Sequence, residues 1–344
     1  MKILYIDEPL DPPGGGQVSL LTLLKNLDVE KFKFLVVLSR DGIFKSILEK
    51  NKIPVVVATI PKLIFIISDY NPDLLHINSA CTKYTFISAL AGKIFGKKII
   101  WHNRVVETSP FKEKLISLLV NKIIVTSDAV MTKFKYTKNK IVKLYNPVDI
   151  ENIRFNIDSD KLKRNLDINE GAKVIGVFSR LEKWKGHEIL FNAFSKLQDK
   201  NIYLLICGTG KEEKNLKKLA LELGIKDNVR FCGYIENVYD YMNICDVIVN
   251  PSVEPEPFGR TIIEGMVLGK TIIATNLGGP REIIQHMVDG ILVEPNPFDL
   301  INALKLVLYD DDLRLRISKN AKLKSEIFCV KNYVTKIIEL YRSL

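Results

Sequence analysis

Short apolar runs alternate with amphipathic segments along the whole first half of the chain. Unbroken apolar runs of four to six residues are typical of strands that are buried on both faces of a parallel sheet. The pattern predicts strands at residues 2–6, 34–38, 55–58, 73–77, 98–102, 122–126 and 141–144, and helices at 18–27, 42–51, 62–69, 83–95, 111–120 and 129–134. This alternation predicts a doubly wound α/β domain, in which ligands bind beyond the carboxyl ends of the strands.

The same alternation restarts in the second half, after a turn signal at Asn146-Pro147-Val148-Asp149. A polar stretch with little periodicity follows to about Asp167, and we predict the interdomain linker there. Strands are predicted at 173–178, 203–207, 229–232, 246–249, 271–275 and 290–293, with three helical segments in 297–344. Two doubly wound halves predict domains at 1–150 and from 151 onward, with a ligand-binding cleft between them.

Composition is that of a folded chain with ample core. Of 344 residues, 47% are hydrophobic, and the mean hydropathy is +0.08. Five cysteines show no C-x-x-C pair, which favours reduced, buried thiols in a cytoplasmic protein over a disulfide or zinc framework. No secretory signal is visible, and the most apolar stretch, residues 54–67, is interrupted and too short to span a bilayer. Any membrane contact is therefore expected to be peripheral.

The net positive charge is confined to the first half of the chain. Residues 1–148 hold 22 Lys and Arg against 12 Asp and Glu, whereas the remainder holds 28 of each. The excess suggests an anionic partner for the first domain, such as membrane lipid, an anionic acceptor or nucleic acid, although lysines also serve only to solvate a surface. The lysines considered for a membrane surface are Lys112, Lys114, Lys122, Lys133, Lys135, Lys138, Lys140 and Lys143.

The richest candidate chemistry lies in residues 250–279. A predicted strand runs into a loop that contains Glu256, and Phe258 and Gly259 open a predicted helix that contains Glu264. Amides at a helix start lack intrahelical partners and favour anions. A phosphate held there would have a carboxylate on either side, and carboxylates accept hydrogen bonds from hydroxyls, so sugars are plausible neighbours. The alternative is that glutamate simply favours a helix start.

Other candidates follow predicted strands at the same edge. Arg180 and Lys185 would bind a pair of phosphates, unless they belong to a solvated basic loop. His102 follows the fifth strand, and His76 follows the fourth; a histidine there is also a common polar filler. The glycines at 14–16 follow the first strand, but they match neither the G-x-G-x-x-G nor the G-K-[ST] spacing.

Taken in order, these motifs resemble the retaining glycosyltransferases of family 4, which have the GT-B architecture. The resemblance covers nearly the whole chain, and its most specific part is the pair Glu256 and Glu264 with Pro-Phe-Gly between them. The motifs are Gly14-Gly15-Gly16, Trp101-His102, Asn146-Pro147-Val148-Asp149, Ser179-Arg180-Leu181 with Lys185-Gly186, Gly208-Thr209-Gly210, Glu256-Pro257-Phe258-Gly259 with Glu264, and Gly278-Gly279.

The resemblance implies a role for each matching residue. Glu256 would hold hydroxyls of the donor sugar and Glu264 the ribose of the nucleotide, while Arg180 and Lys185 would bind the diphosphate. His102 would stand near the transferred sugar. The remaining substrate-binding positions would be Gly15, Gly16, Gly208, Tyr234, Ile235, Phe258, Gly259, Arg260 and Thr261. It also implies a second domain at 151–325 and a C-terminal helix in 326–344 that packs back on the first domain.

Two departures from the family pattern stand out. Arg260 occupies a position where many members have an apolar residue, and Asn103-Arg104 follow His102 where an acidic residue is common.

The implied reaction transfers a hexosyl group, with retention, from a nucleoside diphosphate sugar to a glycan or lipid-linked acceptor of cell-surface polysaccharide or glycolipid synthesis, at the inner face of the membrane. Because the leaving group is an anion, charge stabilisation suffices and no general acid is needed. No cofactor and no metal are expected, since Asp310-Asp311-Asp312 fall in a helical segment. The alternatives are an epimerase of the same architecture, a non-catalytic sugar-nucleotide binder and a nucleic-acid-binding protein, although no nucleic-acid recognition motif is apparent.

Overall fold

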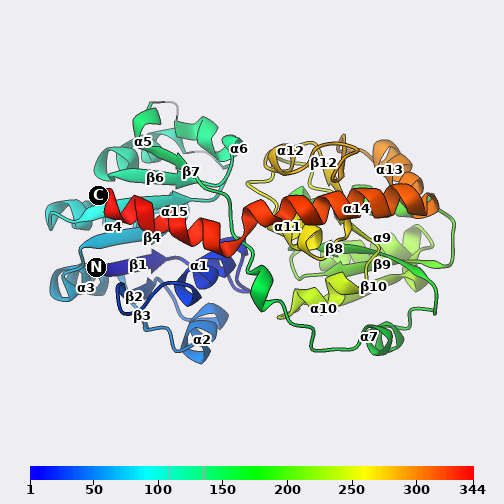
Figure 1. Ribbon diagram of the computed structural model, residues 1–344, viewed down its shortest axis with the longest axis horizontal. Coiled ribbons are helices and arrows are strands. Elements are labelled where there is room, and N and C mark those ends of the chain that lie inside the picture. Colours follow the sequence, from blue (N-terminus) through cyan, green and yellow to red (C-terminus); the bar gives the residue numbers. More distant parts are fainter. Residues whose placement is uncertain (108, 135) are drawn as a thin grey trace. The chain divides into compact units, whose positions relative to one another are not determined.

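The computed structural model describes residues 1–107, 109–134 and 136–344, and it divides into two compact units. Unit 1 comprises Met1–Asp149 together with Phe328–Leu344, and unit 2 comprises Ile150–Ile327. Each unit is built on one sheet whose paired strands all run parallel, with helices on its faces (Figure 1). The predicted α/β class, with two Rossmann-like units, is confirmed.

The sheet of unit 1 has the strand order β3-β2-β1-β4-β5-β6-β7. The core on one face takes its side chains from α1, α2 and α15, and the core on the other takes them from α3 to α6. The elements are β1 Lys2–Asp7, α1 Gly15–Lys25, β2 Lys33–Leu38, α2 Ile43–Lys50, β3 Val55–Val57, α3 Ile60–Tyr70, β4 Leu74–Asn78, α4 Lys83–Ile94, β5 Lys98–Asn103, α5 Pro110–Leu119, β6 Lys122–Val125, α6 Asp128–Met131, β7 Ile141–Lys143 and α15 Val330–Arg342.

The sheet of unit 2 has the equivalent order β10-β9-β8-β11-β12-β13. One core cluster joins this sheet to α8, α9 and α13. The elements are α7 Ser159–Asn165, β8 Lys173–Phe178, α8 His187–Phe194, β9 Ile202–Cys207, α9 Glu213–Glu222, β10 Val229–Gly233, α10 Val238–Asn243, β11 Val247–Asn250, α11 Arg260–Val267, β12 Thr271–Thr275, α12 Pro280–Ile283, β13 Ile291–Val293, α13 Pro297–Tyr309 and α14 Asp311–Ser325.

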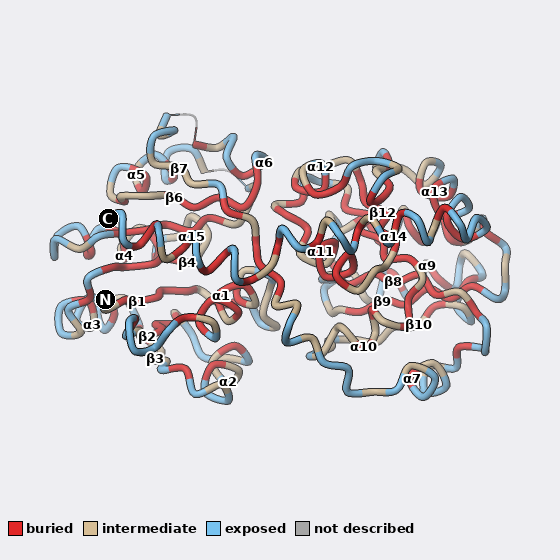
Figure 2. The backbone as a smooth tube through the Cα atoms, viewed as in Figure 1, coloured by how far each residue is buried: buried red, intermediate tan, exposed pale blue. Residues whose placement is uncertain are grey.

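Burial explains why the strands lacked polar alternation. The central strands of both sheets are buried along nearly their whole length, and exposure concentrates on helix surfaces and loops (Figure 2). Helices on both faces remove each strand from water, so both sets of side chains are apolar.

Two sequence predictions need correction. Helix α1 begins at Gly15 rather than at residue 18, so two of the three glycines lie in its first turn instead of in a loop. The stretch predicted as an irregular linker contains α7, whose N-cap Asp158 accepts a hydrogen bond from the amide of Lys161 at 2.9 Å. The Asp cap was a readable signal for a helix start, but it was outweighed by the polar composition.

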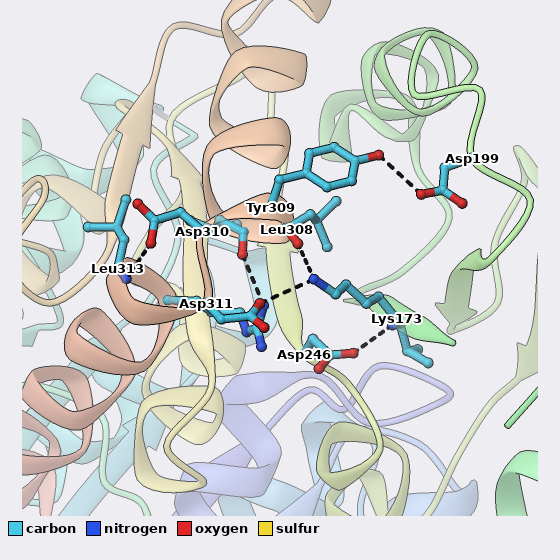
Figure 3. A network of polar contacts seen from close by, with 11 residues as sticks. Lys173, Asp199, Asp246, Leu308, Tyr309, Asp310, Asp311 and Leu313 are labelled. Atoms are coloured by element: carbon cyan, nitrogen blue, oxygen red, sulfur yellow. Dashed lines mark hydrogen bonds and ion pairs between the residues drawn. The ribbon is translucent and has the colours of Figure 1, made fainter. Parts of the chain in front are cut away.

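The acidic run at residues 310–312 has a structural role. It lies at the edge of the unit 2 sheet where the strands begin, opposite the edge formed by their carboxyl ends (Figure 3). Asp310 caps α14 by accepting a hydrogen bond from the Leu313 amide at 2.9 Å. Asp311 pairs with Arg314 and, at 3.2 Å, with Lys173 at the start of β8. Within the part of the chain that the structure describes, no three His, Cys, Asp or Glu side chains are grouped to hold a metal ion.

Candidate active site

The loops at the carboxyl edge of the sheet in unit 2 are locked together by glycines. A Cβ on Gly186 would lie 1.9 Å from the carbonyl oxygen of Pro251, and one on Gly208 would lie 2.0 Å from that of Ser179. Gly278 is equally tight, because its Cβ would fall 2.3 Å from the carbonyl oxygen of Glu256. Contacts this close exclude any side chain, and the loops after β8, β9, β11 and β12 therefore form one packed platform.

Glu256 lies on this platform, and Lys185 contacts it. The Lys185 Nζ donates to both carboxylate oxygens of Glu256, at 2.8 and 2.7 Å. The hydroxyl of Ser252 donates to Oε2 of the same carboxylate at 2.8 Å. Both charged side chains are only about one-tenth exposed, and the Lys185 Nζ lies 4.0 Å from the ring centroid of Trp184. The structure thus brings together two predicted site residues that are 71 positions apart in the sequence.

A second ion pair lies on α11. The Arg260 Nε donates to the Glu264 carboxylate at 2.7 Å, and the two side chains are 11% and 7% exposed. Burial raises the pKa of Glu264, and the guanidinium of Arg260 opposes that rise. Arg260, which departs from the family pattern, is therefore the cation that partly offsets the cost of burying this carboxylate. Gly259 caps α11 in the left-handed region at φ 105°, with no side chain to bond the first amides.

Other predicted positions in unit 2 differ in exposure. Arg180 is exposed, in contrast to Lys185. Tyr234 is 42% exposed after β10, whereas Phe258 is buried. Gly208, Ile235 and Thr261 are partly exposed.

The carboxyl edge of unit 1 holds a network of polar side chains. Asp7 accepts a hydrogen bond from Gln17 at 2.8 Å and another from Asn78. Burial raises the pKa of Asp7 to about 6, although both hydrogen bonds oppose this. The Arg104 Nε donates to Oδ1 of Asn78 at 3.0 Å, so an amide separates the carboxylate from the guanidinium.

His102 lies inside this network. Its Nδ1 is 3.2 Å from the Arg104 guanidinium and 3.2 Å from Nε2 of His76. Gly16 is also close, because a Cβ there would lie 3.2 Å from Cδ of Arg104, and Gly15 is exposed beside it. The contacts of Arg104 explain a sequence position whose role was open.

Sequence reasoning missed several of these residues. Ser252, Asp7 and Gln17 are common residue types without a motif. Asp7 directly follows a predicted parallel strand, as does Asn78, and this position was the available signal.

Comparison with known proteins finds a family model that matches most of the second unit. Residues 158–324 match the family described as "Glycosyl transferases group 1". A curated relative, the D-inositol 3-phosphate glycosyltransferase of Corynebacterium urealyticum, is 34% identical over 54% of this chain and 46% of its own length. The chain spans about half the length of the first curated relatives that it matches.

Longer matches cover both units. The N-acetylgalactosamine-N,N'-diacetylbacillosaminyl-diphospho-undecaprenol 4-alpha-N-acetylgalactosaminyltransferase of Campylobacter jejuni is 26% identical over 72% of each chain. The crystal structure of Anabaena Alr3699/HepE in complex with UDP and glucose matches with a TM-score of 0.91 and 28% identity over the full length of both chains.

Proposed function

We propose that the protein is a retaining, metal-independent glycosyltransferase of the group 1 family that its residues 158–324 match. It moves a hexosyl group from a nucleoside diphosphate sugar to a glycan or lipid-linked acceptor. The observation that carries the proposal is the Lys185–Glu256 pair, held on a glycine-locked platform where the parallel strands of unit 2 end. A cation for the leaving diphosphate then stands beside a carboxylate for the sugar hydroxyls.

Lys185 and Glu256 can each make a further hydrogen bond to the nucleotide sugar. An ammonium has three N–H donors, and two of those of Lys185 point to Glu256, so one remains for a phosphate oxygen. The second oxygen of the carboxylate, Oε1, bonds only Lys185 among the described contacts, so it can also accept from a sugar hydroxyl. The exposed guanidinium of Arg180 adds the second phosphate contact.

The rest of the donor site is proposed from the same platform. The N-terminus of α11, which begins after Gly259, faces the diphosphate, and Glu264, paired with Arg260, accepts hydrogen bonds from the ribose. UDP is the first nucleotide to test, because the Anabaena structure of similar fold contains UDP and glucose. The remaining donor contacts are assigned to Gly15, Gly16, Gly208, Tyr234, Ile235, Phe258, Gly259 and Thr261, with His102 near the transferred sugar.

We further propose that the acceptor meets unit 1, at the cytoplasmic face of a membrane. The name of the Campylobacter relative includes a diphospho-undecaprenol acceptor, which supports a lipid-linked substrate. No helix in the described ranges is long and apolar enough to cross a bilayer, so the contact proposed is peripheral.

We place the proposed membrane surface away from two of the lysines in the run at 133–143. Lys133 is buried and pairs with Glu113 at 3.2 Å, and Lys140 donates to the carbonyl oxygens of Ser117 and Val120, each at 2.9 Å. Those two lysines hold unit 1 together, while Lys135 lies outside the described residues.

Helix α5 offers a better surface. Phe111 and Leu118 are 75% and 62% exposed, and Lys112 and Lys114 are exposed on the same helix. Exposed apolar and cationic side chains on one helix fit an anionic interface.

Release of UDP from a panel of UDP-sugars, with and without candidate glycan and undecaprenyl-diphosphate acceptors, tests the function. We expect acceptor-dependent release that survives a metal chelator, and a product whose anomeric configuration, read by NMR, matches the donor. Glu256→Ala should abolish release. Conversion of the sugar without any acceptor would favour an epimerase, and an inverted product would refute the retaining mechanism.

A further inference from the structure

A chain of hydrogen bonds runs through the core of unit 1 and ends at His102. The Tyr5 hydroxyl is 2.9 Å from the Tyr341 hydroxyl, which is 2.6 Å from Nδ1 of His76. The Nε2 of His76 is 3.2 Å from Nδ1 of His102. All four residues are fully buried. Tyr5 and His76 are paired across β1 and β4, His102 lies on β5, and Tyr341 comes from α15, more than 200 positions later.

The hydrogen bonds of this series could all point from donor to acceptor in either direction. Hydroxyls and neutral imidazoles both donate and accept, so a reversal of every proton in the chain leaves the same distances. Arg104 removes that freedom. A guanidinium only donates, and its contact with Nδ1 at 3.2 Å makes this atom of His102 an acceptor.

The remaining protons follow from this constraint. Because Nδ1 of His102 accepts, the facing Nε2 of His76 must carry a proton, since two lone pairs would otherwise meet. Nδ1 of His76 then accepts from the Tyr341 hydroxyl, which accepts in turn from Tyr5. A neutral His102 must carry its own proton on Nε2.

That proton has no acceptor within the described part of the chain, although the Nε2 atom is buried. Buried donors without partners are rare in native proteins and call for an explanation such as a ligand. The imidazole is also kept uncharged, because burial, followed by the nearby Arg104 and His76, lowers the pKa of His102 well below its usual value.

We propose that Arg104 and Tyr341 are positioning residues that hold His102 as the neutral Nε2–H tautomer, so that its buried proton can be donated to the sugar that the proposed function places beside it. Arg104 selects the tautomer, and Tyr341 ties the histidine pair to α15. The ligand assignment rests on the proposed glycosyl transfer, whereas the tautomer assignment rests on the hydrogen bonds alone. His102 then orients or polarises the sugar and neither gives up nor takes a proton.

Long-range 1H–15N correlation NMR of protein labelled at its four histidines tests the tautomer directly. We expect His102 as the neutral Nε2–H form at pH 7. His187 is an internal comparison, because its Nε2 contacts the Ser179 hydroxyl at 3.2 Å, which can donate or accept and so does not fix a tautomer. An Nδ1–H form or an imidazolium at His102 would overturn the proposal, whether or not any transfer activity is found.

Two substitutions of Arg104 test whether it selects the His102 tautomer or only packs in the core. Arg104→Met should release a mixture of His102 tautomers, whereas Arg104→Lys, which still only donates, should keep Nε2–H. Arg104→Met should lower kcat by about tenfold, the effect of one hydrogen bond. UDP affinity should fall much less than kcat, because the diphosphate and ribose contacts proposed for Arg180, Lys185 and Glu264 lie in unit 2.

Tyr341→Phe should move the His76 signals and lower kcat, again with a much smaller change in UDP affinity. If wild-type protein turns over and both Arg104 variants match it, the positioning role is wrong. If wild-type protein shows no transfer but the Nε2–H form, the proposed function fails while the tautomer assignment stands.

Discussion

The two units share one strand order yet arrange charge in different ways at equivalent edges. In unit 1, Asn78 stands between the carboxylate of Asp7 and the guanidinium of Arg104, and the histidines are neutral. In unit 2, Lys185 and Arg260 contact the carboxylates directly. A network of shared neutral groups fixes orientation, whereas a partly exposed ion pair keeps charge accessible to a ligand. The same topology therefore supports a positioning edge and a charge-binding edge.

The sharpest contrast is between two lysine–glutamate pairs: Lys133–Glu113 in unit 1 is fully buried, whereas Lys185–Glu256 in unit 2 is about one-tenth exposed. Lys133→Met in unit 1 should lower the free energy of unfolding by about 3–5 kcal/mol, because it leaves Glu113 buried without its cation. Lys218→Met is the control, since it removes an exposed pair with Glu222 and should cost less than about 1 kcal/mol. Chemical denaturation measures both, and equal losses would contradict the difference in burial.

Lys185→Ala should lower transfer activity more than stability, which is the reverse of Lys133→Met. Transfer should fall by about 10²–10³, as expected when one group that stabilises a developing anion is removed. The melting temperature should change less than in Lys133→Met, because this side chain is partly exposed and Ser252 still donates to Glu256. Initial rates and thermal melts of the same preparations give the answer. Normal rates in a folded variant would place the lysine outside the reaction.

Acid should weaken unit 2 through His187. Burial is the main cause that lowers the pKa of His187 to about 4, from an ordinary value of 6.5. Between those values the unfolded chain binds the extra proton, so stability declines as the pH drops below 6.5 and the loss ends near pH 4. One such group costs about 2 kcal/mol between pH 7 and pH 5.

His187→Gln should therefore be less sensitive to acid by that amount. Hydrogen exchange of β8 and β9 at the two pH values reports on unit 2 alone. The exposed His286→Gln is the matched control, and it should follow the wild type. An identical acid response in all three proteins would show that another group governs the loss.

The smallest effect concerns the charge difference between the halves. Lys112→Gln on α5 should weaken binding to anionic vesicles by about 1 kcal/mol, roughly fivefold, with the largest loss at low salt. Lys218→Gln on α9 is the control, because it removes an exposed lysine from the half without net charge. Flotation of both variants tests the surface, and absence of wild-type protein from anionic vesicles at low salt would leave a soluble acceptor as the better proposal.

Much of this organisation could be predicted from the sequence. Apolar runs indicated where the strands lie along the chain, and parallel strands place the loops that follow them on one edge, so Arg180, Lys185, Glu256 and Glu264 could be grouped by topology alone. The errors of prediction concerned the start of single helices. The glycines at 15 and 16 suggested a loop because they disfavour helix interiors, but the first turn of α1 accommodates them.

Which side chains meet was decided by the tertiary structure. Glu113 and Lys133 pair across 20 positions, and Lys185 reaches Glu256 across 71. Nothing in the local pattern distinguishes Lys133, which is buried, from Lys112, which is exposed. The physical reason is that backbone hydrogen bonding and hydrophobic periodicity are local and repeat along the chain, so the sequence displays them. The partner of a charge, and hence the tautomer of His102 or the ionisation of Glu264, depends on packing that brings distant segments into contact and excludes water.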